Sequence, residues 1–270
     1  MDTILEAKQI IKEFKVKKER LLDKKSYFRA VNDISLRIRK GQTIGIVGES
    51  GSGKSTVSEI IGDLQKPTSG TINYEGKDIR KLSQAEYRDF RKNVQFIFQS
   101  PKDSLHPFYT IKENLLEPLK IYAEEFNQKQ AMIEIENMIK KVNLDVSILK
   151  KHASEISGGQ AQRVAIARAL LLKPKVIICD ECVSALDVSV QAQILDLLLD
   201  LQEEFATSYL FISHDISAVN YVSDYVVVMK NGEVLEEGVT DQVLFQPQSD
   251  YTKTLISSSF LSEEDEVHAL

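Results

Sequence analysis

Two stretches near the N-terminus carry the hydrophobic pattern of half-buried strands. Residues 4–14 and 30–38 have the character of extended segments. In the second stretch, Ile34, Leu36 and Ile38 alternate with polar or charged neighbours. A period of two places successive side chains on opposite faces of a strand. The pattern therefore predicts two strands, each with one buried face.

Three short apolar runs are typical of more deeply buried strands: Thr43–Val47, Val176–Cys179 and Tyr209–Ile212. The first is closed by a glycine-rich segment, as a buried parallel strand would be, and the other two are followed by polar residues. Functional side chains are expected at these polar strand ends. Further along, Asn231-Gly232 separates two strand-like runs, which favours a tight hairpin.

Helical periodicity alternates with these strands. Apolar residues recur on one face of Ala131–Val142, where Asn127 is the candidate N-cap. A second stripe covers Val190–Phe205 with Ser189 before it, and Ala161–Leu172 forms another helical stretch. Strands that alternate with helices predict an α/β fold with a largely parallel core sheet.

Composition narrows the class of protein without revealing a function. The 270 residues include 34 Lys+Arg and 40 Asp+Glu, so the formal net charge is −6, which argues against a nucleic-acid footprint spread over the fold. No apolar run approaches the roughly 18 residues that a membrane span needs, and no secretion signal is evident. Two cysteines cannot form a disulfide framework. We expect a soluble intracellular protein, with a frayed acidic tail from Ser257.

The segment after the first apolar run fits a phosphate-binding pattern. Gly48–Ser55 matches G-x-x-x-x-G-K-[ST] and follows a predicted strand, as the pattern requires. Glycines let backbone N–H groups curl round a phosphate, Lys54 supplies positive charge, and the Ser55 hydroxyl can ligate Mg²⁺. A helix that begins at Ser55 would point its positive end at the same anion. The expected nucleotide-binding residues of this segment are Gly48, Ser50, Gly51, Ser52, Gly53, Lys54, Ser55 and Thr56.

A second candidate site lies at the end of the apolar run Val176–Cys179. Asp180 and Glu181 follow it directly. Downstream of a phosphate-binding loop, Asp180 is expected to hold Mg²⁺, directly or through a water. Glu181 is the candidate general base that polarises the attacking water.

A third motif, Ile156–Gln160, precedes the helical stretch Ala161–Leu172. Ser157 is a good N-cap, glycines permit close backbone approach, and a helix N-terminus favours an anion. With the two preceding sites, this segment resembles the signature of the nucleotide-binding subunit of ATP-binding cassette (ABC) proteins. Ile156 stands where the family usually has Leu. The resemblance implies that ATP contacts Ser157, Gly158, Gly159 and Gln160.

The same resemblance assigns roles to single residues. Gln99 resembles the family's Q-loop glutamine, which senses Mg²⁺ and water, and His214 resembles the switch histidine that contacts the γ-phosphate. Asp187, in Ser184–Asp187, resembles the D-loop aspartate that helps communication across a dimer. The implied catalytic residues are therefore Glu181, His214 and Gln99, and the implied Mg²⁺ ligands are Ser55, Gln99 and Asp180.

The adenine-stacking residue is less clearly placed. Phe14 is our choice because it lies at the end of the first predicted strand, and Tyr27 and Phe28 are the alternatives. The basic segment 16–25 separates these candidates. That segment is interpreted first as a solvated loop between strands, with contact to phosphate or a partner as the alternative.

Several longer stretches are similar to the ATPase subunits of the oligopeptide, dipeptide and nickel importer group. They include Gln99–Pro107, Ser184–Gln193 and Tyr251–Leu255. The resemblance implies an ATPase on the cytoplasmic face of the bacterial membrane, with transmembrane permeases as partners and a substrate-binding protein as an indirect one. It also implies a homo- or heterodimer that sandwiches ATP, with Mg²⁺, between the phosphate-binding loop and the signature. The cargo, peptides or nickel and metal chelates, is not encoded here.

The implied architecture is a P-loop NTPase fold, the ABC nucleotide-binding domain. It covers residues 1–258 with an antiparallel β subdomain, an inserted α-helical subdomain at about 100–172, and an acidic tail at 259–270. Cys179 and Cys182 are interpreted as packing residues, and no iron–sulfur cluster is expected. The alternative function is a soluble ABC ATPase that acts on nucleic acid or ribosomes, but the single cassette and the acidic balance favour transport without nucleic acid. A small-molecule kinase would not account for Ser157–Gln160.

Overall fold

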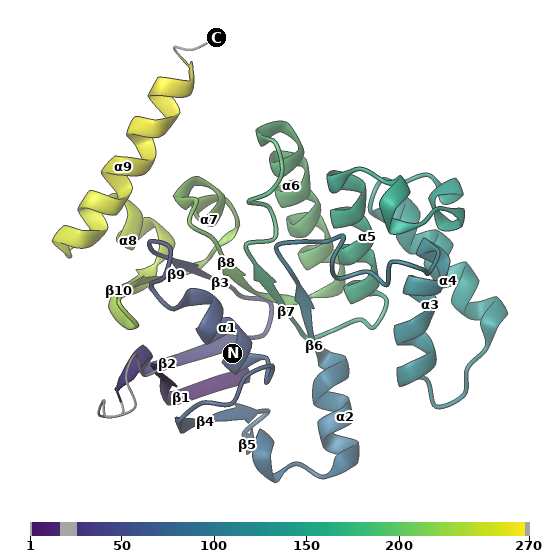
Figure 1. The fold of residues 1–270 in the computed structure, drawn as a ribbon, viewed down its shortest axis with the longest axis horizontal. Coiled ribbons are helices and arrows are strands. Elements are labelled where there is room, and N and C mark those ends of the chain that lie inside the picture. The colour runs from purple at the N-terminus through teal and green to yellow at the C-terminus, as the bar shows by residue number, and fades with distance from the viewer. Residues whose placement is uncertain (1, 17–25, 268–270) are drawn as a thin grey trace. The chain divides into compact units, whose positions relative to one another are not determined.

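The computed structural model describes residues 2–16 and 26–267, with side chains up to residue 258. It divides into two units, one formed by residues 1–82 and 209–270 and the other by residues 83–208. Figure 1 labels the elements of both units.

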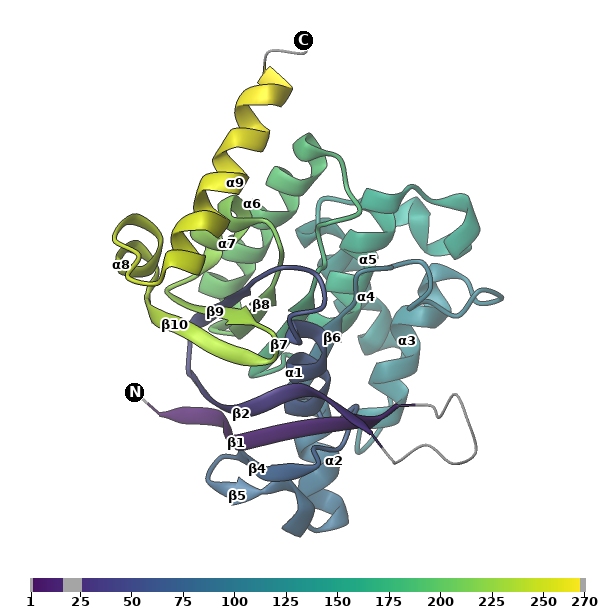
Figure 2. The same cartoon turned by 60° about the vertical axis from the view of Figure 1, so that its left-hand side comes forward.

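An antiparallel sheet in the first unit has the strand order β2-β1-β4-β5. Its strands are β1 (Thr3–Lys15), β2 (Tyr27–Arg39), β4 (Ser69–Tyr74) and β5 (Lys77–Asp78). Ala7 lies opposite Leu36 near one end of the β1–β2 pair, and Phe14 lies opposite Phe28 at the other. Figures 1 and 2 show β1, β2 and β4 side by side. The predicted strands 4–14 and 30–38 are confirmed.

A second group of strands in the first unit surrounds β3. It consists of β3 (Thr43–Val47), β8 (Ser208–Ile212), β9 (Tyr225–Lys230) and β10 (Glu233–Val239). β3 is wholly buried and pairs in parallel with both β8 and β9, as the apolar run predicts. β10 returns antiparallel to β9 through Asn231 and Gly232. Both turn residues have φ near +50° to +80°, which a type I′ hairpin requires, so the predicted hairpin is confirmed.

Short helices and a longer C-terminal helix complete the first unit. They are α1 (Lys54–Ile61), the 3₁₀ turn η1 (Ile79–Lys81), α7 (Ile216–Val222), α8 (Thr240–Phe245) and α9 (Asp250–Val267). The predicted fraying from Ser257 is wrong for the described backbone, because α9 continues to Val267. The stretch lacks Gly and Pro and contains Leu and Glu, which have high helix propensity.

The second unit contains a parallel strand pair and most of the long helices. Its elements are α2 (Gln84–Asn93), β6 (Val94–Ile97), α3 (Ile111–Tyr122), α4 (Gln128–Lys141), the 3₁₀ turns η2 (Val146–Lys150) and η3 (Ala153–Glu155), α5 (Gly158–Leu170), β7 (Val176–Asp180) and α6 (Val188–Phe205). β6 and β7 run in parallel, with Ile97 opposite Cys179. Their carboxyl ends therefore lie at one edge, where polar loop residues can converge.

Helix starts in this unit follow capping chemistry. Asn127 caps α4 by accepting hydrogen bonds from the backbone N–H groups of Lys129 and Gln130, which confirms that prediction. The expected start of the next stripe at Ser189 is wrong, because α6 begins at Val188 and its N-cap is Asp187. Asp187 displaces Ser189 from the cap because its carboxylate accepts from the Val190 N–H at 3.0 Å.

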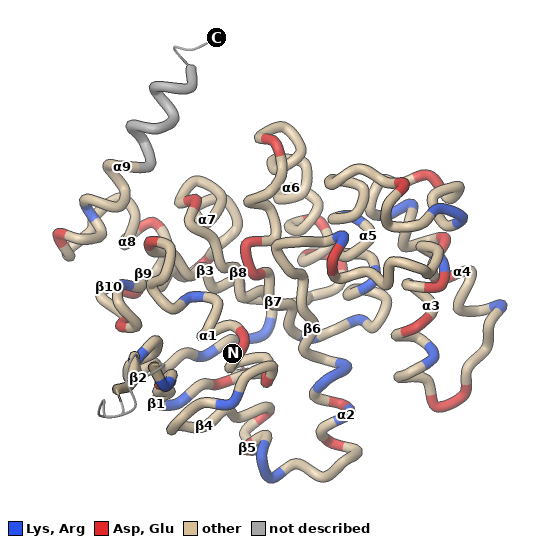
Figure 3. The backbone as a smooth tube through the Cα atoms, viewed as in Figure 1, with Lys and Arg blue, Asp and Glu red and all other residues tan. Residues whose placement is uncertain are grey.

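Both signs of charge occur along the chain. In Figure 3, basic and acidic segments follow one another along α2, whereas α6 carries only acidic ones. None of the helices within residues 2–16 and 26–267 combines the length and the apolar character that crossing a bilayer requires.

Candidate functional site

The phosphate loop, Gly48–Ser55, joins β3 to α1 in the first unit. Gly48 has φ +152° and Gly53 has φ +101°, conformations that residues with a side chain rarely adopt. A Cβ at Gly48 would lie 2.1 Å from the carbonyl oxygen of Met229, and one at Gly53 would lie 2.4 Å from that of Ala30. Glycine is therefore needed at both positions, for backbone conformation and for space.

Polar groups within this loop fit a phosphate ligand. Lys54 is only 4% exposed, and its Nζ donates to the carbonyl oxygens of Gly48 at 2.8 Å and Glu49 at 3.0 Å. The Ser52 Oγ is buried without a hydrogen-bond partner in the described structure. A buried hydroxyl without a partner is costly unless a ligand or water satisfies it. The loop thus gathers a cation, an unsatisfied hydroxyl and the N-terminus of α1, the features that bind an anion.

His214 lies in the same unit, in the loop between β8 and α7. β8 pairs in parallel with β3, so the loops after both strands leave from the same sheet edge. The Ser213 N–H donates to the Ile46 carbonyl at 3.2 Å, which ties this loop to the end of β3. The Asp215 carboxylate caps α7 by accepting from the Ala218 N–H. His214 is exposed between these two anchored residues.

The acidic residues occupy the corresponding edge of the second unit. Asp180 is the last residue of β7, and both it and Glu181 are half-buried. The Gln99 amide, on the loop after β6, donates to Glu181 Oε2 at 3.0 Å and to Ser184 Oγ at 3.3 Å. The structure thus brings together two of the predicted catalytic residues. Ser184, which the sequence did not single out as a site residue, joins them.

The backbone of Glu181 is unusual for a residue with a side chain. Its φ is +48°, in the left-handed region. Such a conformation costs on the order of 1–3 kcal/mol and persists where surrounding contacts hold it. The Ser184 Oγ supplies one such contact by donating to the Glu181 carbonyl at 2.9 Å. The turn therefore fixes the direction in which the Glu181 carboxylate leaves the strand.

The two cysteines next to this turn are packing residues. Cys179 and Cys182 are 0% and 1% exposed, and neither forms a disulfide. The hydrogen bond with Cys182, followed by burial, raises the pKa of the Cys179 thiol well above its usual value. Both thiols are buried and Cys179 stays protonated at neutral pH, which fits the packing interpretation.

The signature segment forms the capped start of α5. The Ser157 Oγ accepts from the Gln160 N–H at 3.2 Å, and the Gln160 Oε1 accepts from the Ser157 N–H at 3.1 Å. This capping box leaves Gly158 and Gly159 as the first helical residues. Gly158 is exposed and Gly159 is half-buried, while Ile156 is buried. The exposed turn therefore presents a helix N-terminus without side chains.

Asp187 belongs to the same unit, at the start of α6. Its carboxylate accepts from the Val190 N–H at 3.0 Å and from the Ser189 hydroxyl at 2.8 Å. The Val190 hydrogen bond, followed by that of Ser189, lowers the pKa of Asp187. Asp187 is therefore ionised at neutral pH, as a helix N-cap favours.

The candidate adenine-stacking residues lie at one end of the β1–β2 pair. Phe14, Tyr27 and Phe28 are 40%, 57% and 57% exposed. Phe14 is paired opposite Phe28, and the Lys12 Nζ lies 5.2 Å from the centre of the Phe14 ring. Because these aromatic residues share the hairpin end, the choice of Phe14 over the other two stays a prediction. The basic residues 17–25 lie outside the described part.

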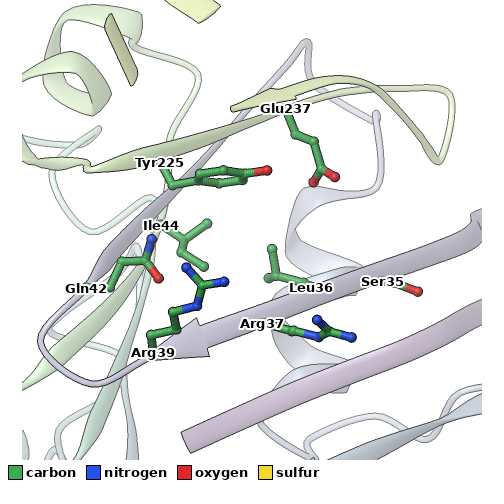
Figure 4. Close-up of a pocket in the computed structure, with 8 residues that line it drawn as sticks. All are labelled: Ser35, Leu36, Arg37, Arg39, Gln42, Ile44, Tyr225 and Glu237. Atoms are coloured by element: carbon green, nitrogen blue, oxygen red, sulfur yellow. The ribbon is translucent and has the colours of Figure 1, made fainter. Parts of the chain in front are cut away.

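One cavity in the first unit lies apart from the predicted residues. Its volume is about 300 Å³, and Figure 4 shows Arg39 and Tyr225 among the side chains that line it. Glu237 lies on the β10 side. Burial, with the Glu237 charge as a second cause, raises the pKa of Tyr225. None of the lining residues belongs to the predicted nucleotide site.

The donor set also suits Mg²⁺ bound together with a nucleotide. Within residues 2–16 and 26–267, no group of three or more His, Cys, Asp or Glu side chains forms a metal site of its own. Mg²⁺ usually keeps several waters and takes one or two carboxylates plus substrate phosphates. A hydroxyl at Ser55 and a carboxylate at Asp180 match that habit.

Sequence comparison places the chain among known proteins. Residues 31–184 match the family described as ABC transporter. The chain is 44% identical to the oligopeptide transport ATP-binding protein OppF of Salmonella typhimurium, over 88% of this chain and 71% of that protein. It is 42% identical to the oligopeptide transport ATP-binding protein AppF of Bacillus subtilis, over 95% and 78% of the two chains.

Solved structures with the same fold carry a related description. The dimeric ATP-binding cassette MJ0796 in a post-hydrolysis state, bound to ADP and Pi, is similar with a TM-score of 0.77 and 30% identity, over 88% of this chain and 99% of that one. The cbiO1 protein of Clostridium perfringens, part of the ABC transporter complex cbiONQ, is similar with a TM-score of 0.75 and 27% identity, over 91% and 92%. These findings confirm the predicted fold class and family. The chain belongs to the ABC transporter family and is one of its ATP-binding, ATP-hydrolysing cassettes.

Proposed function

We propose that this chain is the ATPase subunit that powers the import of oligopeptides through a membrane ABC transporter. The observation that carries the proposal is the 44% identity to an oligopeptide transport ATP-binding protein over 88% of the chain. Nickel and metal chelates, the other predicted cargo, have no counterpart among the similar proteins named above. Peptides are therefore the cargo class to test first.

Each predicted site residue has a role in this proposal. The backbone N–H groups of the phosphate loop and the Lys54 ammonium bind the β- and γ-phosphates. When bound, Mg²⁺ neutralises charge that develops on the phosphate oxygens, and Ser55, Asp180 and Gln99 are its proposed ligands. Glu181 accepts a proton from the attacking water, and His214 contacts the γ-phosphate.

The signature and D-loop have roles that need a second chain. ATP bound at the phosphate loop of one chain is covered by Ser157–Gln160 of the other, and Asp187 relays contact between them. The dimeric description of MJ0796 supports this arrangement. Two permease subunits are the proposed partners in the membrane, a substrate-binding protein is the indirect one, and the chain is a peripheral protein on the cytoplasmic face.

The test is uptake by cells that lack the gene for this chain. Uptake of a radiolabelled tetrapeptide is expected to fall in the deletion strain and to return with the unmodified gene. Glu181→Gln should not restore it, whereas Glu125→Gln, an exposed acid between α3 and α4, should. Loss of nickel uptake with normal peptide uptake would assign a metal cargo. Unchanged uptake of both, with the chain bound to ribosomes or DNA, would overturn the transport proposal.

A further inference from the structure

The chain segment before α9 is anchored to β10 of the same unit. The Glu236 carboxylate accepts from the backbone N–H of Gln248 at 2.8 Å and from that of Ser249 at 3.0 Å. Burial acts to raise the pKa of Glu236, but these hydrogen bonds outweigh it and lower the pKa. Thr252, in the first turn of α9, is fully buried. Figures 1 and 2 show this end of α9 beside α8 and β10, so residues 248–252 form a fixed part of the unit.

Tyr251 extends from this anchored segment to the phosphate loop. Its hydroxyl oxygen accepts a hydrogen bond from the Glu49 backbone N–H at 3.2 Å. The Lys230 Nζ lies 4.3 Å from the centre of its ring, which holds the ring between the end of β9 and the loop. Burial, the largest cause, raises the pKa of Tyr251, so the hydroxyl stays protonated at neutral pH. Two residues 202 positions apart in the sequence are thus joined at the nucleotide-binding loop.

Glu49 is the residue through which this contact acts on Lys54. The carbonyl oxygen of Glu49 accepts from the Lys54 Nζ at 3.0 Å. On the other side of the loop, the Gly232 N–H donates to the Ser52 carbonyl at 2.9 Å. The loop is therefore held at Ser52 by the β9–β10 hairpin and at Glu49 by Tyr251. Without the Tyr251 contact, the Glu49 peptide would be restrained from one side only.

We propose that Tyr251 is a positioning residue that holds the Glu49 turn of the phosphate loop in the conformation that binds nucleotide. A preorganised loop loses less conformational freedom when phosphate binds, so the contact raises affinity without touching the ligand. Because Tyr251 lies outside the reacting groups, the contact acts on binding and leaves the hydrolysis step unchanged. This inference concerns nucleotide binding and does not depend on the identity of the cargo.

The test compares two tyrosines of the full-length chain by titration with Mg–ATP and Mg–ADP and by steady-state hydrolysis. Tyr251→Phe keeps the ring and removes the hydroxyl, and Kd and KM are expected to rise about 2- to 10-fold, the effect of losing one hydrogen bond. We expect kcat and Tm to stay unchanged. Tyr225→Phe is the matched control, because Tyr225 is a half-buried tyrosine of the same unit that lines the cavity of Figure 4.

A second variant separates the hydroxyl from the packing of the ring. Tyr251→Ala should raise Kd at least as much as Tyr251→Phe and should also lower Tm, because it removes the ring below Lys230. The proposal is overturned if Tyr251→Phe binds both nucleotides as tightly as the unmodified chain. It is equally overturned if the variant lowers kcat and Tm while Kd stays unchanged.

Discussion

The side-chain amide of Gln99 donates a hydrogen bond to the Glu181 carboxylate, with 3.0 Å between Nε2 and Oε2. The two residues follow neighbouring parallel strands, β6 and β7. The amide therefore orients a carboxylate whose own backbone lies in the left-handed region. A general base needs this kind of fixed direction, because proton transfer depends on geometry before it depends on pKa.

Replacing Glu181 by Gln should stop hydrolysis and leave nucleotide binding intact. The amide cannot accept the proton of the attacking water, so kcat should fall about 10²- to 10⁴-fold. Phosphate release measures the rate, and Glu125→Gln is the control. Stalled hydrolysis should also make an ATP-dependent dimer visible by sedimentation. A variant that stays monomeric in saturating Mg–ATP without permeases would rule out sandwich formation by this chain alone.

Replacing Gln99 by Glu should change the pH dependence of hydrolysis. Two carboxylates in place of the 3.0 Å amide contact repel each other, which raises the pKa of at least one of them. The acid limb of the pH–rate profile should therefore move to higher pH, with a lower rate at pH 7. Gln99→Ala removes the hydrogen bond without adding charge, so its rate should fall without that movement. Identical profiles for the two variants would refute the electrostatic part of this prediction.

The local sequence was sufficient for the phosphate loop and insufficient for its support. Gly48 and Gly53 follow a spacing that only one kind of turn satisfies, so the loop could be predicted from its own residues. The contact between Glu49 and Tyr251 depends on how α9 packs, and no local pattern encodes it. Tyr251 was noticed only as part of a family-like stretch.

Two other differences have the same physical origin. Asp187 and Ser189 are both good N-cap residues, so the pattern did not decide between them, and the hydrogen bond to Val190 did. Phe14 and Phe28 both stand at strand ends, and the antiparallel register places them opposite each other. Long-range pairing, rather than propensity, decided these cases.

The two signature glycines should respond differently to alanine. A Cβ at Gly159 would lie 2.8 Å from Cγ1 of Val190, whose branched side chain is stiff, whereas the nearest atom to a Cβ at Gly158 is Leu186 Cδ2 at 3.8 Å. Gly159→Ala should lower the free energy of unfolding by about 1–3 kcal/mol, the usual cost of overpacking. Gly158→Ala should unfold in urea like the unmodified chain. Equal loss of stability in both variants would contradict this steric account.

Gly158→Ala then isolates function from folding. A methyl group on the exposed first turn of α5 blocks close approach of a phosphate to the helix N-terminus, so ATP-dependent dimerisation in the Glu181→Gln background should be lost. Nucleotide binding to the monomer should be retained, because the phosphate loop is unchanged. A Gly158→Ala variant that dimerises normally would show that this turn does not cover ATP.

The start of α6 should make a pH-dependent contribution to stability. Because the hydrogen bond from the Val190 N–H lowers the pKa of Asp187 in the folded state, the ionised carboxylate stabilises the fold above its unfolded pKa of about 3.9. That contribution is lost as the pH falls through the lower folded value. Urea unfolding of the unmodified chain and of Asp187→Asn should therefore differ at pH 7 and converge on acidification towards pH 3. Asp200→Asn, an exposed change on the same helix, corrects for the loss of one charge. If the difference between the unmodified chain and Asp187→Asn is the same at pH 7 and pH 3, the capping interaction does not depend on the charge of Asp187.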